Sequence, residues 1–275
     1  MLVAVIFAVG CNAAPGGQNQ QAAAAPAVEP LGPSYVLSDG LDFLARLDFK
    51  SDGEFRFLWT GDTGVVAEGS GRYEAAADSV RLIPGPMEFR RDPRTFAERM
   101  HRIHWGAREY LVPEERMLAF ANAINAGREP RTHAIGAIFY PRSGDEGKAS
   151  SGAPPLPGRW QEFLLSKPLA GTVTKVVQRE TDTQRPIVVI NRGSNAGLRE
   201  GMTLVAVNPR RPHFRADLTI LSLQPESAQA EVGFQYNHIR VCDIWKSSVR
   251  EAAQQADAGA DEALLSACMA QKPRS

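Results

Sequence analysis

The sequence predicts a mainly β protein with a few helices (α+β), built from two small antiparallel β-barrel-like domains and a C-terminal helix. Three observations predict this fold. Apolar and polar residues alternate in short runs over residues 41–83 and again after residue 171, which is typical of half-buried strands. Turns that contain glycine separate these runs, as in antiparallel meanders. A segment rich in Gly, Ser, Pro and charge, residues 143–158, divides the runs into two domains.

The N-terminus begins with an apolar segment, residues 1–10, which is too short to cross a bilayer as a helix. It ends in Ala8-Val9-Gly10-Cys11, which resembles the lipobox of bacterial lipoproteins. The resemblance implies a signal peptide cleaved after Gly10, acylation of Cys11, and attachment to a membrane through this lipid anchor. Two alternatives remain open: a secretory peptide cut after Ala13 or Ala14, and a buried N-terminal strand.

Residues 11–34 follow as a predicted tether. They are mostly Ala, Gln, Gly, Pro and Asn, and Glu29 carries the only charge. Such a composition buries too little apolar surface to offset the entropy of ordering, so we expect a disordered spacer that lifts a domain off a membrane. With the lipobox-like leader, it predicts a bacterial cell-envelope location, facing the periplasm or the exterior.

The first domain, residues 35–142, is predicted to be β-rich with one helix. Aromatic residues recur at alternate positions on its first two strands, on one face of a hairpin. If that face lined a barrel mouth, it would form a pocket for a small apolar ligand, made by Phe43, Phe55, Phe57 and Trp59. The expected strands are 41–49, 54–59, 65–73, 79–83, 100–105, 109–112 and 135–140, with a helix from Pro113 to Gly127. Residues 105–112 and 120–131 also resemble stretches of uncharacterised exported bacterial proteins.

The second domain, residues 159–247, is predicted to be a small β-barrel. Its expected strands are 171–177, 186–191, 203–207, 217–223 and 228–234. The loop over residues 191–202 reads Asn-x-Gly-Ser, then Gly-Leu-x-x-Gly-Met. This pattern resembles a small barrel of envelope scaffolds, found in the rod-shape-determining membrane-anchored protein and in a flagellar assembly protein. Those barrels usually have Gly-Asp after the last strand, where this chain has Cys242-Asp243.

The C-terminal segment, residues 248–275, is predicted to form a helix and a short tail. With Cys11 assigned to lipid, Cys242 and Cys268 are an even remainder in an exported chain. A helix that packs back on the barrel would bring them together. A disulfide is favoured over two separate buried thiols.

Composition and motifs then limit the function. Lys plus Arg and Asp plus Glu both number 31, so the formal net charge is zero and nucleic acid is not an expected partner. The sequence contains no familiar catalytic or phosphate-binding motif, and we predict no cofactor. His101 and His104, with His133 as a third, are the best metal candidates. Their spacing of three on a strand puts His101 and His104 on opposite faces, so we predict no metal site.

Together these features predict a membrane-tethered, non-catalytic envelope lipoprotein that acts as a scaffold or adaptor for an envelope protein partner. Two alternatives remain. One is a carrier of a small apolar ligand in the first domain. The other is a hydrolase whose site has no recognisable motif, which would require a cleft with convergent acids or histidines.

Overall fold

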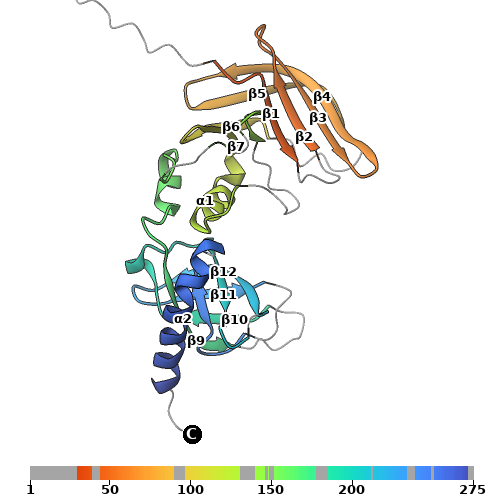
Figure 1. Cartoon of the computed structure of the whole chain (residues 1–275). Helices are drawn as coiled ribbons and strands as arrows, with labels where there is room; N and C mark the ends of the chain where they lie inside the picture. Colours follow the sequence, from red (N-terminus) through yellow and green to blue (C-terminus); the bar gives the residue numbers. More distant parts are fainter. Residues whose placement is uncertain are drawn as a thin grey trace, which may run out of the picture.

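The computed structural model describes residues 30–38, 44–89, 97–130, 140–145, 148, 152–177, 185–211, 213–233, 239–248 and 251–271. Two antiparallel β-sheets follow one another along the chain, and helix α1 lies between them (Figure 1). The predicted fold class, mainly β with two barrel-like sheets and a C-terminal helix, is confirmed.

The first sheet is an up-and-down meander in which each strand pairs with the one before it. A bridge between Tyr35 and Arg142 brings its last strand back to its first. The N–H of Ser143 also donates to the carbonyl oxygen of Ser34 at 2.9 Å, so the sheet curls closed. The strands are β1 (Ser34–Ser38), β2 (Leu44–Phe49), β3 (Glu54–Gly61), β4 (Gly64–Ala75), β5 (Ser79–Phe89), β6 (Arg99–Trp105), β7 (Arg108–Pro113) and β8 (Tyr140–Pro141).

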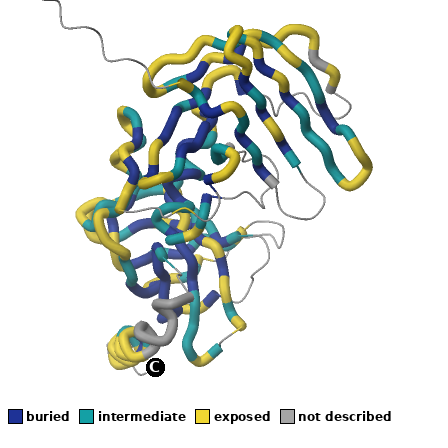
Figure 2. Tube along the Cα trace, turned by 45° about the horizontal axis from the view of Figure 1, so that its top comes forward, coloured by how far each residue is buried: buried dark blue, intermediate teal, exposed yellow. Residues whose placement is uncertain are grey.

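The first core follows from the alternation of apolar residues along β2 and β3. Leu47 pairs with Phe57 and Phe49 pairs with Phe55 across the predicted hairpin, and all four side chains are buried. The turn between the strands places Gly53 at φ +85°, a conformation that glycine adopts without steric cost. The dark-blue residues of Figure 2 show how such buried positions alternate with exposed ones along the strands.

A buried polar network fastens the closure of this barrel. The carboxylate of Glu109, which is 0% exposed, accepts hydrogen bonds from Tyr35 Oη at 2.6 Å, Arg102 Nε at 2.5 Å and Arg142 Nη1 at 2.9 Å. Burial and the bond to Glu109 raise the pKa of Tyr35, so the phenol remains a neutral donor. Because these residues come from β1, β6, β7 and the position directly after β8, the network ties the ends of the meander together.

The predicted helix after Pro113 begins as a short 3₁₀ turn, Glu114–Arg116, and continues as α1 (Met117–Asn125). Its inner face, including Met117 and Phe120, packs against buried residues of β6 and β7. The helix therefore covers the end of the first barrel that faces the second.

The second sheet is a closed barrel with the strand order β10-β13-β12-β11-β14-β9. Gly193 allows the loop after β10 to pass close to another loop, because a Cβ there would lie 1.9 Å from the carbonyl oxygen of Gln224. On β10 Val188 and Ile190 are buried, and the residues on the other face are only half-buried. The elements are β9 (Ala170–Val177), β10 (Ile187–Ile190), β11 (Thr203–Val207), β12 (Arg215–Leu223), β13 (Ala228–Val232), β14 (Ile244–Lys246), the 3₁₀ turns Gly158–Phe163 and Ser194–Ala196, and α2 (Glu251–Gln271).

Several boundaries differ from those expected. Ser34, assigned to the tether, is the first residue of β1, and Leu31 packs against the first core. The predicted strand 135–140 lies outside the described residues except for Tyr140, which belongs to β8. Among the α2 residues whose side chains are described, Leu265 is buried and Leu264 is half-buried.

Candidate ligand-binding pocket

Two asparagines on α1 join the two barrels. Asn122 Nδ2 donates to the carbonyl oxygen of Gly201, and Asn122 Oδ1 accepts from the N–H of Thr203, both at 3.1 Å. Asn125 repeats the arrangement one turn later, donating to Phe163 O at 2.7 Å and accepting from the N–H of Leu165 at 2.9 Å. Each side-chain amide both donates a hydrogen bond to the backbone of the second half of the chain and accepts one from it. These bonds fix the relative position of the barrels.

The same junction contains a pocket of about 300 Å³. It lies beside α1 and is lined by Trp105 and Ile124 from the first domain and by Leu165 and Pro168 from the second. Ser248, which also lines the pocket, donates from its hydroxyl to the carbonyl oxygen of Ala126 at 3.3 Å. This cavity is part of the joint between the barrels, so we assign it a structural role.

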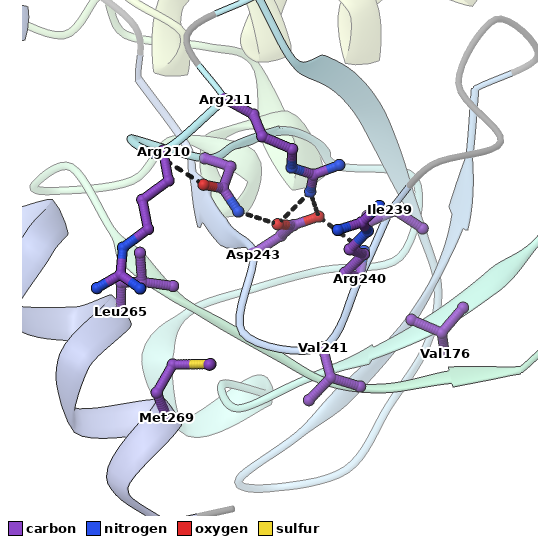
Figure 3. Close-up of a pocket in the computed structure, with 10 residues that line it drawn as sticks. Val176, Arg210, Arg211, Ile239, Arg240, Val241, Asp243, Leu265 and Met269 are labelled. Carbon is purple, nitrogen blue, oxygen red and sulfur yellow. Dashed lines mark hydrogen bonds and ion pairs between the residues drawn. The ribbon is translucent and has the colours of Figure 1, made fainter.

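A larger pocket, of about 750 Å³, lies on the second barrel beside α2 (Figure 3). Four of its ten lining residues are charged and five are apolar, so a single ligand could meet both kinds of surface. The residues come from the end of β9, the loop after β11, the loop before β14, and α2. They are Val176, Asn208, Arg210, Arg211, Ile239, Arg240, Val241, Asp243, Leu265 and Met269.

Asp243 organises the polar side of this pocket. Its carboxylate is 0% exposed, and Arg211 Nη2 donates to both oxygens at 2.6 and 2.7 Å. Asn208 Nδ2 donates to it at 2.6 Å, and the backbone N–H of Arg240 donates at 2.7 Å. These charge-assisted bonds occupy the carboxylate and hold the two loops together. Arg211 also stacks on Phe214, with its guanidinium carbon 4.2 Å from the ring centre.

Cys242 and Cys268 form a disulfide, as favoured from the sequence, with their Cα atoms 5.6 Å apart. Cys242 has φ +71° and is the one non-glycine residue with positive φ in the described part of the chain. Glycine adopts such a backbone more readily than cysteine does. The chain thus places a cysteine in a glycine-like turn, and the disulfide then anchors α2.

Two ion pairs and an apolar contact complete the attachment of α2. Lys246 Nζ lies 2.8 Å from Asp261 Oδ2, and both side chains are largely buried. Arg210 Nη2 lies 2.8 Å from Glu262 Oε1 at the exposed edge. Leu265, 4% exposed, packs in one cluster with Cys242 and Ile244. The helix is therefore a fixed wall of the pocket.

The other predicted site residues have different surroundings. Gly10, Cys11 and Phe43 lie outside the described residues. Phe55 and Phe57, expected to line a ligand pocket, are 1% exposed in the first core, and Trp59 is half-buried against the same cluster. The described members of this set therefore pack into the interior of the first barrel.

The histidines behave as strand residues. His101 Nε2 hydrogen-bonds to Glu114, and this bond lowers the pKa of the Glu114 carboxyl below its usual 4.5. His104 is exposed, whereas His133 lies in a part of the chain that is not described. Over the ranges that the structure describes, no three His, Cys, Asp or Glu side chains are grouped as a metal site.

Sequence reasoning missed the pocket on the second barrel. It noted Cys242 in place of glycine, but it gave no role to Arg240, Val241 or Met269. The cysteine pair was the usable signal, because a helix bonded to that turn must pass over the neighbouring loops. Of the helices in the described ranges, none is both long and apolar enough to span a membrane.

Comparisons with protein-family models, with curated proteins and with solved structures each gave no match to this chain.

Proposed function

We propose that the protein is a membrane-tethered, non-catalytic lipoprotein of the bacterial cell envelope that acts as a scaffold or adaptor. The observation that carries this proposal is the joint at α1, where Asn122 and Asn125 each make two hydrogen bonds to the second half of the chain. A joint of this kind holds two binding surfaces at a fixed separation, which a scaffold needs and a flexible pair of modules lacks.

The tether supports the same proposal. The lipobox-like residues before Cys11 would place a lipid at the start of the spacer. If the residues that follow Cys11 form the flexible coil that their composition predicts, they would span roughly 25 Å on average. The barrels would then stand clear of the lipid headgroups while remaining close to the membrane.

The chemistry of the buried charges favours a binding role over a catalytic one. Buried Glu109 is paired with Arg102, and buried Asp243 with Arg211. Each of these groups forms its ion pair or hydrogen bond with a neighbouring residue of the fold. Such pairs stabilise a fold, whereas a general acid or base needs access to a substrate.

Site-specific photocrosslinking in cells tests the proposal. A photoreactive residue is placed at Ile83 on β5, which is 40% exposed, or at Leu221 on β12, which is 42% exposed. We expect a discrete protein partner at one or both positions, and its loss when the same probe is carried by a Cys11→Ser chain. Absence of a discrete partner at both positions, or a pattern unchanged by Cys11→Ser, would contradict a tethered adaptor.

A further inference from the structure

We propose that the pocket beside α2 binds an anionic amphiphile: a molecule with a carboxylate or phosphate head on an aliphatic chain. The proposal goes beyond the adaptor role and does not depend on it. It rests on three properties of the pocket, namely its fixed walls, its excess of arginine and its exposed apolar floor.

The pocket is large enough and firm enough for such a ligand. Its volume of about 750 Å³ falls inside the range of roughly 300–1,000 Å³ that is usual for small-molecule sites. The Cys242–Cys268 disulfide and the Lys246–Asp261 ion pair hold α2, which forms one wall. Because these walls are already ordered, binding costs little further conformational entropy.

The charges favour an anionic head. Three arginines and one aspartate line the pocket. The Asp243 carboxylate is occupied by Arg211, Asn208 and the N–H of Arg240. The Arg210 side chain pairs with Glu262 at the edge of the pocket but is 58% exposed, so part of its guanidinium faces solvent. A carboxylate or phosphate can accept several N–H groups from such a guanidinium cluster.

The apolar residues favour an aliphatic chain beside that head. Val241 is 37% exposed and Met269 is 47% exposed, which is unusually high for large hydrophobic side chains in the described ranges. In Figure 3 Arg211 and Arg240 lie beside Asp243, and the side chain of Arg210 extends away from it toward Leu265. Val176 and Val241 lie on the other side of the pocket. An aliphatic chain laid over this side would remove apolar surface from water. Met269 can adjust to its shape, since methionine is flexible and polarisable.

Isothermal titration calorimetry on the full-length chain tests the proposal, with Cys11→Ser introduced so that no attached acyl group competes. The probes are decanoate, decyl phosphate, neutral decyl maltoside and cationic decyltrimethylammonium, each below its micellar concentration. We expect saturable binding of the two anions at about one per chain, and binding at least about tenfold weaker for the neutral and cationic probes. Tighter binding of decanoate would indicate a carboxylate source, and tighter binding of decyl phosphate a lipid phosphate.

Matched variants locate the binding. Arg240→Glu and Met269→Ser change exposed residues of the pocket. The controls Arg192→Glu and Leu221→Ser introduce the same new residues at exposed positions outside the pocket. We expect each pocket variant to weaken decanoate binding about tenfold and each control to bind decanoate as the parent does. The thermal unfolding temperature of all four variants should equal that of the parent. Equal binding of the neutral probe, equal loss in the controls, or no saturable binding of either anion would overturn the proposal.

Discussion

The side-chain amide of Asn122 donates to the carbonyl oxygen of Gly201 at 3.1 Å, across the boundary between the two barrels. Gly201 has φ +81°, and Leu118 of α1 lies so close that a Cβ there would be 2.7 Å from its Cδ2 atom. Helix α1 therefore contacts the glycine loop of the second barrel through both a hydrogen bond and close packing. The junction is built from residues of both domains, so the folding of one domain should depend on the other.

Replacing Asn122 with alanine tests this coupling. Asn122 is 8% exposed, and the change removes its two hydrogen bonds and leaves Gly201 O and Thr203 N without those partners. We expect a loss of about 1–3 kcal/mol in unfolding free energy, measured by urea denaturation. Asn195→Ala is the matched control, because its bond to Glu226 is exposed. Equal stability of the Asn122→Ala and Asn195→Ala chains would show that the joint contributes nothing.

The disulfide should matter most for α2. It closes a loop with a sequence separation of 26 residues, for which chain entropy predicts a stabilisation of about 3 kcal/mol. We expect Cys268→Ser, or treatment with reductant, to lower the thermal unfolding temperature. Hydrogen exchange in α2 should also become faster. Protection of α2 that is the same with and without reductant would contradict its role as the anchor.

The backbone conformation at Cys242 leads to a separate prediction about stability. Its φ of +71° belongs to the left-handed region, which costs a residue other than glycine about 1–2 kcal/mol. In a Cys268→Ser background, Cys242→Gly should therefore be more stable than Cys242→Ala by about 1 kcal/mol. Denaturation of the two double variants measures this difference directly. If alanine were as stable as glycine, the turn would not have the conformation described.

The acid stability of the first barrel should depend on Asp145. Burial alone would raise the pKa of its carboxyl. Hydrogen bonds from Lys148 and the N–H of Glu109, with the charge of Arg142, outweigh burial and lower it below 3.8. A lowered native pKa stabilises the fold above the unfolded value, and this contribution is lost as the pH falls through the native value.

We therefore expect the unfolding free energy to fall as the pH drops below about 4. Urea denaturation at a series of pH values measures this fall. Asp145→Asn should remove part of that fall, whereas Asp62→Asn, at an exposed turn between β3 and β4, should not. A pH profile of the Asp145→Asn chain that superimposes on that of the parent would be evidence against this assignment.

Much of the fold could be predicted because its signals are local. The alternation at Ala45, Leu47 and Phe49 gave a strand, and Gly53 gave its turn, without knowledge of any distant residue. Strand β14, only three residues long, was missed because its burial comes from β9 and β11 on either side. Strand β1 was missed for a similar reason, since Tyr35 is buried by partners such as Glu109 that come much later in the chain.

The pocket illustrates the same limit. Arg210 and Met269 are far apart in the sequence, and neither belongs to a motif. They line one cavity because the disulfide brings α2 over the loops of the barrel. The cysteines predicted that the helix lies over the turn at Cys242, but the loop with Arg210 is brought to that turn only by the folding of the barrel.

The membrane attachment in the proposed function depends on lipid at Cys11. Mass spectrometry of the N-terminal peptide from protein purified out of its native membrane measures this directly. We expect a peptide that begins at Cys11, with a diacylglycerol on the sulfur atom and residues 1–10 removed. A peptide that begins at Met1, or one that begins after Ala13 or Ala14 without fatty acyl groups, would contradict it.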